Sequence, residues 1–454
     1  MTILGLDETE ATALVRAVRP GEEERPAVAE AVARAAWSAI SEPGDRDAGL
    51  LVAALGPVEA AARLIRRVPA ATLRAELTEA LTAVPAGPLT EHGPPSVAAL
   101  EEALARWRPR VSAREVVRAL GQAARFGVGL VLPGDVEWPA GLADLGAHAP
   151  HALWLRGSRE LLAQAAGSLA LVGSRAATGY GEHVAGELAA GTVARGLAVV
   201  SGGAYGIDGV AHRAALAAEG TTIAVLAGGL DRFYPAGHEE LLARVVRSGA
   251  VVAEVPCGVA PTRWRFLQRN RIIAAMSRAT IVVEAGWRSG ALNTASHAES
   301  LGRPIGVVPG PVTSAASAGC HRLLRENPEA VLVTSAEEAV ELASAGLRME
   351  ATVGGGLIGE AGPSGASRSA SAGRNDAGSS GARSDDEPEL VRLLDALSAR
   401  SPREPEQLAR LSGLAVDRVR ARLGVLELEG RVRARSGAWL RVAARGGPAR
   451  GGPG

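Results

Sequence analysis

Four short motifs in the middle third of the chain carry residue types that could bind phosphate groups. They are VGSR at Val172–Arg175, SGGAYGID at Ser201–Asp208, RNR at Arg269–Arg271 and SGALNTA at Ser289–Ala295. Each is expected at a strand-to-helix turn, where backbone amides, hydroxyls or guanidinium groups can approach a phosphate. None supplies a nucleophile with a neighbouring base or a metal cluster. The motifs therefore indicate binding of a phosphate backbone more than chemistry upon it.

The VGSR motif is expected to close the first strand of the central sheet. Gly173 would let backbone amides approach a phosphate, Ser174 adds a hydroxyl, and the guanidinium of Arg175 can bind two phosphate oxygens at once. The alternative is a tight turn with a solvated arginine. A motif this short does not decide between them.

The SGGAYGID motif is expected to end the second strand and to begin a helix. Ser201, Gly202, Gly203 and Gly206 would form a nest of backbone amides at the positive end of that helix. Asp208 is interpreted as a helix N-cap or first-turn acid and not as a catalytic base. The glycine spacing differs from the dinucleotide-binding pattern G-x-G-x-x-G. We therefore interpret the motif as a phosphate nest.

The segment Thr262–Ile273 combines arginines with aromatic side chains. Arg269 and Arg271 lie in its RNR motif, two further arginines precede them, and no acidic residue occurs from position 261 to 278. Guanidinium groups interleaved with Trp264 and Phe266 suit a single nucleic-acid strand, which offers phosphates and base faces. The alternative is a solvated arginine face with two core aromatics. The absence of acids favours a basic patch.

The fourth motif follows the segment VVEAGWR. Ser289 and Gly290 would form the turn, and Thr294 would lie at the start of the next helix, where hydroxyls and amides again suit phosphate. Glu284 is expected to end the strand and to cap a helix or pair with an arginine. The eight histidines are scattered and are interpreted as structural. No catalytic triad, metal site or acid pair is predicted.

Composition limits the classes of function. The chain has 454 residues, enough for two to four domains, and it contains no lysine, which excludes a Walker-type phosphate loop, Schiff-base chemistry and pyridoxal attachment. Its formal net charge is zero, so any nucleic-acid role must rest on a local patch. The two cysteines lack metal-type spacing. With neither a signal pattern nor a membrane-length apolar stretch, a cytoplasmic protein without a membrane partner is expected.

The elements that must position these motifs alternate along the chain. Near-continuous apolar strands alternate with helices and predict an α/β fold with a doubly wound parallel sheet. The expected strands are Leu169–Gly173, Ala198–Ser201, Thr222–Ala227, Val251–Glu254, Thr280–Glu284 and Pro304–Val308. The expected parts of the chain are an N-terminal helical module at 1–127, the sheet domain at 128–350, a Gly/Ser-rich flexible linker at 351–386, a winged-helix domain at 387–445 and a disordered tail at 446–454.

The ordered set of motifs resembles the DNA-processing protein A (DprA/Smf) family. The set comprises VGSR, SGGAYGIDGVAH, GGLDRFYP at Gly228–Pro235, FLQRNRIIA at Phe266–Ala274, SGALNTA and VVPGPV at Val307–Val312. Each piece is weak alone, but their order and spacing are specific. The layout of a helical module, a sheet domain and a winged helix also fits.

The resemblance implies an extended Rossmann-like fold with a SAM-like N-terminal module. It implies a cytoplasmic protein without a cofactor or catalysis, which dimerises with a second copy. That protein would bind and protect incoming single-stranded DNA and load the RecA recombinase onto it in natural transformation and recombination. The strand-binding positions that the resemblance implies are Gly173, Ser174, Arg175, Ser201, Gly202, Gly203, Gly206, Arg269, Asn270, Arg271, Ser289, Gly290 and Thr294.

Three positions depart from the family pattern, two of them after the loop GGLDRFYP and one in the segment after VVPG. The family often has a basic residue and an asparagine after FYP, where this chain has Ala236 and His238, and an asparagine where His321 stands. A phosphate contact from this loop is therefore open, with Arg232 as the candidate.

Two other functions remain as alternatives. A nucleotide phosphoribohydrolase-like Rossmann enzyme would need a PGG-x-GT-x-x-E turn, of which Gly290, Thr294 and Glu299 give a faint echo. A winged-helix DNA-binding regulator would use the helix at Val416–Leu426, whose three arginines are offset by Asp417 and two following glutamates.

Overall fold

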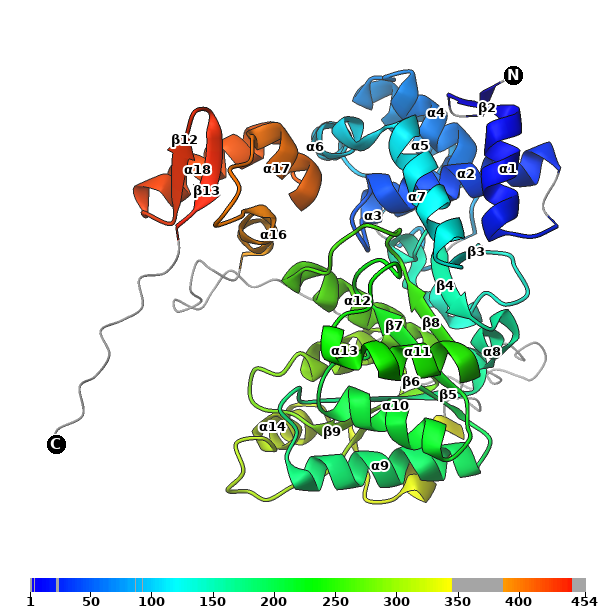
Figure 1. Cartoon of the computed structure of the whole chain (residues 1–454), viewed down its shortest axis with the longest axis vertical. Coiled ribbons are helices and arrows are strands. Elements are labelled where there is room, and N and C mark those ends of the chain that lie inside the picture. Colours follow the sequence, from blue (N-terminus) through cyan, green and yellow to red (C-terminus); the bar gives the residue numbers. More distant parts are fainter. Residues whose placement is uncertain are drawn as a thin grey trace, which may run out of the picture.

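The structure is a computed structural model that describes residues 2–3, 5–21, 24–85, 87–91, 93–344 and 387–442 (Figure 1). The linker and the C-terminal tail predicted from composition lie outside these residues.

The N-terminal part is helical, as predicted. After a short hairpin of β1 (Thr2–Ile3) and β2 (Leu6–Asp7), its helices are α1 (Glu8–Val18), α2 (Arg25–Ile40), α3 (Arg46–Leu55), α4 (Pro57–Ile65), α5 (Ala70–Thr82), α6 (Val97–Trp107), the 3-10 turn η1 (Arg108–Arg110) and α7 (Ala113–Arg125). Asp7, Asp45, Ser96 and Ser112 cap four of these helices with side-chain hydrogen bonds to first-turn amides.

Helices α3 and α4 are separated by Gly56, which has φ of +79°. This left-handed conformation interrupts an apolar stretch that could otherwise continue as one helix. The two helices meet at 112°, and only together would they have the length and hydropathy of a membrane span; no single helix in the described part of the chain does.

A nine-stranded sheet forms the centre of the molecule. Its strands are β3 (Gly129–Val131), β4 (Leu153–Gly157), β5 (Ser168–Gly173), β6 (Ala198–Ser201), β7 (Thr222–Leu226), β8 (Ala250–Ala253), β9 (Ala279–Glu284), β10 (Ile305–Val307) and β11 (Val331–Leu332). Their order is β11-β10-β9-β5-β6-β7-β8-β4-β3. The six strands expected from the sequence, β5 to β10, are confirmed with ends shifted by at most one residue.

The sheet is mixed, which refines the expectation of a parallel sheet. The strands from β11 to β8 are parallel, whereas β4 pairs antiparallel with β8 and β3 pairs antiparallel with β4. The antiparallel pair precedes the first parallel strand in the sequence and extends one edge of the sheet. The Rossmann-like doubly wound arrangement is confirmed.

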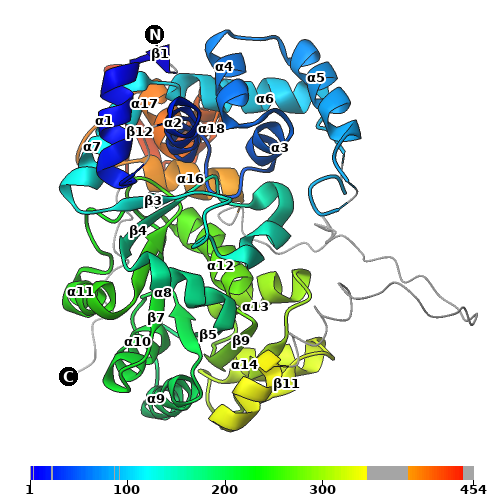
Figure 2. The same ribbon diagram turned by 90° about the vertical axis from the view of Figure 1, so that its right-hand side faces the viewer.

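Helices cover both faces of the sheet (Figures 1 and 2). The helical elements of this part are η2 (Ala140–His148), α8 (Arg159–Ala163), η3 (Gln164–Gly167), α9 (Gly179–Ala194), α10 (Ile207–Ala217), η4 (Ala236–His238), α11 (Glu239–Ser248), α12 (Arg263–Met276), α13 (Ala291–Ser300) and α14 (Ala318–Glu326). On β5, Leu169 and Leu171 face the core beneath α9 and α10, while Ala170 and Val172 face the core of α12 and α13. This alternation explains why β5 is apolar at every position from Leu169 to Val172.

The N-terminal helices share a hydrophobic core with one end of the sheet. Trp37 and Trp107 are fully buried and meet edge to face, and the same cluster contains Trp154 of β4 and Leu226 of β7. The indole N–H of Trp154 donates to the hydroxyl of Ser38 at 3.3 Å. The helices therefore pack directly on the sheet (Figure 2).

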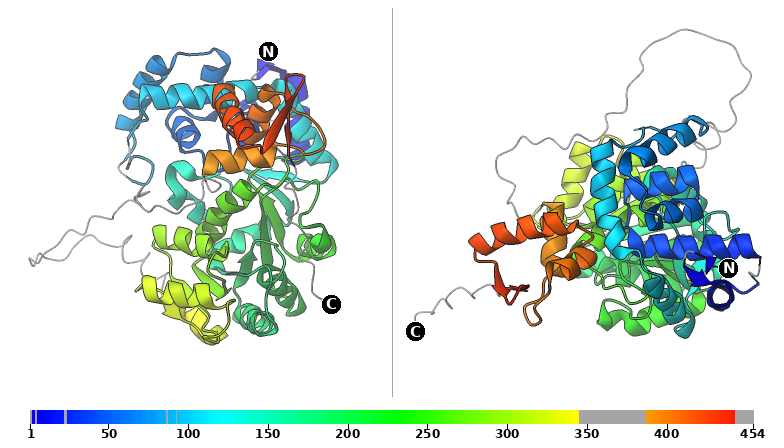
Figure 3. Two further views of the ribbon diagram at one scale, coloured as in Figure 1. Left: turned by 90° about the vertical axis from the view of Figure 1, so that its left-hand side faces the viewer. Right: turned by 90° about the horizontal axis from the view of Figure 1, so that it is seen from above.

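The C-terminal part is a winged helix, as predicted. It consists of α16 (Pro388–Ala396), α17 (Pro405–Ser412), α18 (Val416–Leu428) and the hairpin of β12 (Val432–Arg435) and β13 (Ala438–Arg441), around a core of its own. Helix α16 packs against α12, and α17 packs against η1 (Figure 3). The winged helix therefore contacts both the sheet domain and the N-terminal helices.

Candidate functional site

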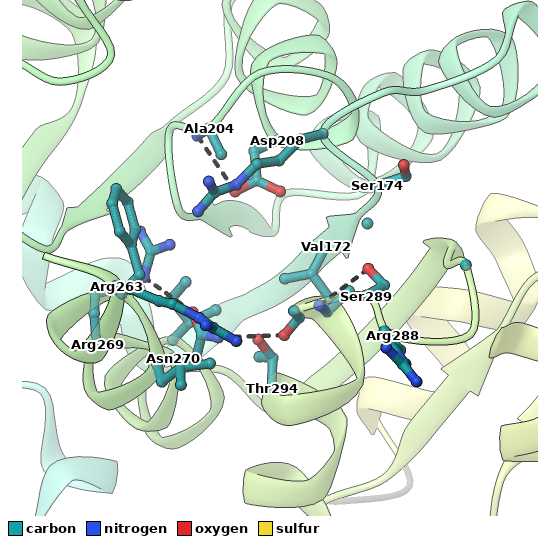
Figure 4. Close-up of a pocket in the computed structure, with 18 of the residues that line it drawn as sticks. Val172, Ser174, Ala204, Asp208, Arg263, Arg269, Asn270, Arg288, Ser289 and Thr294 are labelled. Carbon is teal, nitrogen blue, oxygen red and sulfur yellow. Dashed lines mark hydrogen bonds between the residues drawn. The ribbon is translucent and has the colours of Figure 1, made fainter. Parts of the chain in front are cut away.

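A cleft of about 810 Å³ lies at the carboxyl ends of the parallel strands. Strand β5 starts the series that runs through β6, β7 and β8 in one direction, whereas β9 lies on its other side. The loops after β5 and β9 therefore diverge, and open α/β sheets form their ligand sites at such a switch point. Figure 4 shows Asp208 and Ala204 on one side of the cleft and Ser289 and Thr294 on the other.

The loop after β5 forms one wall of the cleft and contains the VGSR motif. A Cβ on Gly173 would lie 2.5 Å from the Ile207 side chain, so only glycine lets the loop pack this closely. The Ser174 amide donates to the Glu284 carbonyl at 2.7 Å and fixes the turn. Arg175 is exposed, with its guanidinium 4.7 Å from the centroid of the Phe266 ring. Its charge is thereby held at the cleft.

The loop after β9 forms the opposite wall and contains the Ser-Gly turn. The Asn270 side chain donates to the Gly290 carbonyl at 3.3 Å and to the Asn293 side chain at 3.1 Å, which ties the turn to α12. Helix α13 begins directly after Gly290, with Thr294 in its first turn. The positive end of this helix therefore faces the cleft.

The glycine nest after β6 is filled by the protein itself. Asp208, in the first turn of α10, accepts from the Gly202 amide at 3.1 Å and from the Ala204 amide at 3.4 Å. The Ser201 hydroxyl is fully buried and donates to the Leu171 carbonyl. Burial raises the pKa of Asp208, which Arg269 and the two amides oppose. The phosphate nest expected here is corrected: its amides bind an internal carboxylate.

The other two glycines of that motif support the walls. At Gly206, φ is +73° and a Cβ would lie 2.2 Å from the Ser174 carbonyl oxygen, so this glycine lets α10 start against the VGSR turn. The Gly203 carbonyl lies 3.0 Å from Nδ1 of His238, which is buried against the Tyr205 ring. His238, a departure from the family pattern, thus braces the nest.

The arginine-rich segment forms helix α12, which distributes its arginines in different directions. Arg269 is buried and donates to the carbonyls of Gly202 and Val225. Burial lowers the pKa of its guanidinium to about 10, so it remains charged at neutral pH. Arg271 forms a buried pair with Glu254 at 2.6 Å, on the side of α12 away from the cleft. The single basic patch expected from the sequence is corrected.

The charges that line the cleft are mainly positive. Four arginines, from the two loops and α12, lie there with two aspartates. Arg175 and Arg288 are exposed and form no ion pair with any residue that the structure describes. Asp208 is engaged with the nest amides, and Asp395 of α16 accepts from the Arg263 amide at 2.8 Å. The cleft can therefore attract and hold an anionic chain.

Comparisons with known proteins identify the family of the chain. A family model described as DNA recombination-mediator protein A matches residues 129–344, and one described as the DprA winged helix domain matches residues 378–438. A putative DNA processing protein DprA of Mycobacterium tuberculosis is 46% identical over 350 residues, covering 74% of this chain and 83% of that protein. The chain belongs to the DNA recombination-mediator protein A family.

Two further members show the same relationship. Protein Smf of Escherichia coli is 43% identical over 221 residues, covering 48% of this chain and 57% of that protein. The X-ray structure of DNA processing protein A from Streptococcus pneumoniae has a TM-score of 0.52 and 26% identity, covering 69% of this chain and 96% of that one. The resemblance inferred from the motifs is confirmed.

The positions expected from the family motifs divide into two groups. Eight line the cleft: Gly173, Ser174, Arg175, Arg269, Asn270, Ser289, Gly290 and Thr294. Five do not: Ser201, Gly202, Gly203, Gly206 and Arg271. The second group is engaged inside the protein, and Gly202 has no room for a Cβ because the Arg269 guanidinium would lie 2.5 Å from it. These residues shape the cleft from behind.

Several cleft residues of this family member were not selected from the sequence. Trp287, Arg288, Tyr234 and Asp395 all line it. Arg288 directly precedes the Ser-Gly turn, so its position next to that motif could have identified it as a cleft residue from the sequence. Asp395 comes from the winged helix, more than a hundred residues from the other cleft residues, and no local pattern indicates it. Arg232 lies outside the cleft lining.

Acidic groups near the cleft have structural partners. Glu284 accepts from the Thr178 amide at 2.9 Å and from its hydroxyl at 2.7 Å, which fixes the start of α9, as the capping interpretation expected. Glu299, part of the faint phosphoribohydrolase echo, is exposed outside the cleft and accepts from Asn327. The described part of the chain contains no cluster of His, Cys, Asp or Glu that could hold a metal ion.

Helix α18 of the winged helix pairs its three arginines with glutamates. On α18, Arg418 pairs with Glu389, Arg420 with Glu406, and Arg422 with Glu387 and Glu389. A helix that reads duplex DNA needs cations available for phosphates and bases. These pairs therefore weaken the case for a duplex-reading regulator.

Proposed function

We propose that this chain binds single-stranded DNA in the cleft by its sugar–phosphate backbone. The observation that supports the proposal most directly is the pair of exposed, unneutralised guanidinium groups, Arg175 and Arg288, on the two loops that diverge at the switch point. Each can form a forked contact with a phosphate, and the first residue of α13, Ala291, lines the same cleft.

Binding is expected to be independent of sequence. Reading a base edge needs side chains with donors and acceptors, such as asparagine or arginine. The amide side chain that lines the cleft, Asn270, is already bonded to Gly290 and Asn293, and Arg269 is bonded to two carbonyls. Arg175 and Arg288 remain exposed, and their charges attract the phosphates of any strand.

The proposal includes a role in recombination. As a member of a recombination-mediator family, the protein would protect incoming strands and load the RecA recombinase onto them, acting as a cytoplasmic homodimer. Stimulation of RecA filament growth on DNA coated with single-strand-binding protein tests the loading, and sedimentation equilibrium tests the dimer. Family membership supports this part of the proposal, which stands or falls separately from strand binding.

The decisive experiment is a salt series with the double variant R175A/R288A. For an oligonucleotide of arbitrary sequence, the slope of log K against log salt should decrease in size by about 1.4, since each single-strand phosphate contact contributes about 0.7. Affinity should fall roughly 25-fold at 0.1 M salt by the same relation. Fluorescence anisotropy with single-stranded and duplex probes measures both.

The matched control is R74A/R114A. It removes two exposed arginines from α5 and α7, so the net charge changes equally but the cleft does not. An unchanged slope in R175A/R288A, or an equal change in the control, would contradict backbone binding in the cleft. Release of a free base from nucleoside monophosphates by the wild-type protein would favour the hydrolase instead.

A further inference from the structure

Exposed aromatic side chains gather at the edge of the sheet that bears the cleft. The chain has seven tryptophans, three tyrosines and three phenylalanines, all within the described residues. Five of these thirteen are largely exposed, and four of the five follow the parallel strands: Tyr180, Tyr205, Tyr234 and Trp287. Phe126 is the fifth and lies at the end of α7. A single exposed aromatic is ordinary, whereas this concentration at one edge marks an interaction site.

Trp287 lies on the loop after β9 and lines the cleft beside Arg288. Its side chain is 53% exposed, which is the largest value among these aromatics. The Arg322 guanidinium lies 4.9 Å from its ring centroid, and Arg322 itself pairs with Glu326 at 3.5 Å. The arginine therefore covers one face and holds the indole in place, while the rest of the ring stays accessible.

Tyr234 lines the same cleft from the loop after β7 and is 49% exposed. Its ring packs against Phe266, with centroids 5.7 Å apart. Phe266 also lies under the Arg175 guanidinium and is therefore a support, with Tyr234 as the exposed ring above it. Two aromatic platforms, each backed by a protein group, thus stand in one cleft with the phosphate-binding arginines.

We propose that Trp287 and Tyr234 are stacking platforms for unpaired nucleobases of the strand whose phosphates bind Arg175 and Arg288. Stacking uses the face of a base, which every base presents, so it adds affinity without sequence preference. A duplex hides these faces, so the platforms select single strands. This inference rests on the proposed function. It adds a contact with the bases, which the phosphate-binding arginines do not make.

The experiment compares two probes with equal numbers of phosphates. One is a fluorescein-labelled 20-mer of deoxythymidine, and the other is the same backbone with abasic tetrahydrofuran residues in place of every nucleoside. Wild-type protein should bind the thymidine probe at least about 5-fold more tightly, because each stacked base contributes about 1–3 kcal/mol, a factor of about 5 to 150. W287A and Y234A should each lose affinity for thymidine and keep their affinity for the abasic probe.

Conservative and control variants separate stacking from folding. W287F and Y234F retain a ring and should bind thymidine nearly as well as wild type, whereas F126A, which removes the exposed ring outside the cleft, should change nothing. Trp287 is the one tryptophan in the described residues with a largely exposed side chain. Strand binding should therefore quench intrinsic fluorescence in wild type, and W287F should lose that quenching while still binding.

The outcomes are distinguishable from those of the proposed function. Equal wild-type affinity for both probes, with a normal salt slope, would overturn the stacking platforms and leave backbone binding intact. Binding of neither probe would overturn the proposed function itself. Loss of affinity for both probes in W287A would show that Trp287 supports the cleft without contacting bases.

Discussion

At the scale of single residues, the same side-chain type performs different tasks around the cleft. Arg175 and Arg288 are exposed and available to a ligand, whereas Arg271 is buried in a pair with Glu254. Removing one partner of such a buried pair typically costs about 3–5 kcal/mol, because the other charge remains without compensation. Loss of binding in an Arg271 variant would therefore reflect loss of folding. Variants of the exposed arginines are the ones that test contact with a ligand.

Gly206 provides a residue-scale prediction. A Cβ there would lie 2.2 Å from the Ser174 carbonyl oxygen, and φ of +73° is unfavourable for any residue with a side chain. We expect G206A to lower the free energy of unfolding by about 1–3 kcal/mol and to displace the turn that carries Arg175. Chemical denaturation and strand-binding titration measure the two effects.

The control for this glycine is G179A at the start of α9. A Cβ on Gly179 meets no atom within 4 Å, and its φ is not positive. This variant should retain wild-type stability and binding. If G206A behaved in the same way, the close packing of α10 against the VGSR turn would not determine the position of Arg175.

At the scale of elements, the geometry of helix α12 explains why its arginines point to different sides of the helix. Successive residues of an α-helix are rotated by about 100°, so residues two apart point to nearly opposite sides. Arg263 lines the cleft, while Arg265 bonds to Glu42 of the N-terminal part at 2.9 Å. Arg269 and Arg271 repeat this division. A segment without acids of its own is neutralised by acids from other elements.

Asp395 on α16 leads to an element-scale prediction. It is one of two carboxylates that line a mainly cationic cleft, and it accepts a hydrogen bond from the backbone of α12. D395N keeps the shape and the acceptor oxygen but removes the charge, so affinity for single-stranded DNA should rise roughly two- to tenfold at low salt. Titration at 50 mM and 300 mM salt should show the gain shrinking as salt increases.

The appropriate comparison is D417N, in the same winged helix. The Asp417 side chain is 97% exposed on α18 and lies outside the cleft lining. D417N removes the same unit of charge and should leave the affinity for single-stranded DNA nearly unchanged. An equal gain in both variants would indicate a general effect of net charge and would rule out a specific role for Asp395.

At the scale of the whole molecule, three parts of the chain meet around Glu42. This buried carboxylate accepts from Arg265 of α12 at 2.9 Å and from Arg110 of η1 at 2.5 Å. Arg110 also donates to the Arg410 carbonyl of the winged helix. Burial alone would raise the pKa of Glu42, but Arg265 and Arg110 outweigh it and lower the pKa to about 2.

This junction predicts how stability depends on pH. Because the folded-state pKa of Glu42 lies below its ordinary value of 4.5, its contribution is fully present above pH 4.5 and is lost as pH falls toward about 2. The contribution is on the order of 3 kcal/mol at neutral pH. E42Q should therefore be less stable than wild type at pH 7 and should show a weaker loss of stability upon acidification.

Thermal unfolding between pH 7 and pH 2.5 measures this dependence. E115Q is the control, since the Glu115 side chain on α7 is 45% exposed and pairs only with Arg118 among the described residues. It should follow the wild-type curve. Parallel curves for E42Q and wild type would mean that the three parts of the chain are not held together by the ionised Glu42.

Local sequence patterns were sufficient to predict the sheet, the winged helix and the positions of the loops. Strands buried on both faces are apolar throughout, and glycines mark the turns at their ends, so β5 to β10 could be located within a residue. Eight of the expected site residues line the cleft for the same reason, since loops that follow parallel strands must meet at one edge.

Which of these groups a ligand can reach depends on long-range packing, which local patterns do not show. Hydrogen bonds and ion pairs between distant segments, such as Glu42 with Arg265 and Glu254 with Arg271, leave no pattern in the sequence near either partner. The nest at Gly202 has the composition of a phosphate site, but the Asp208 carboxylate that fills it is placed there by the packing of α10. Local composition fixes what a segment can bind, and long-range packing fixes whether that capacity is already used.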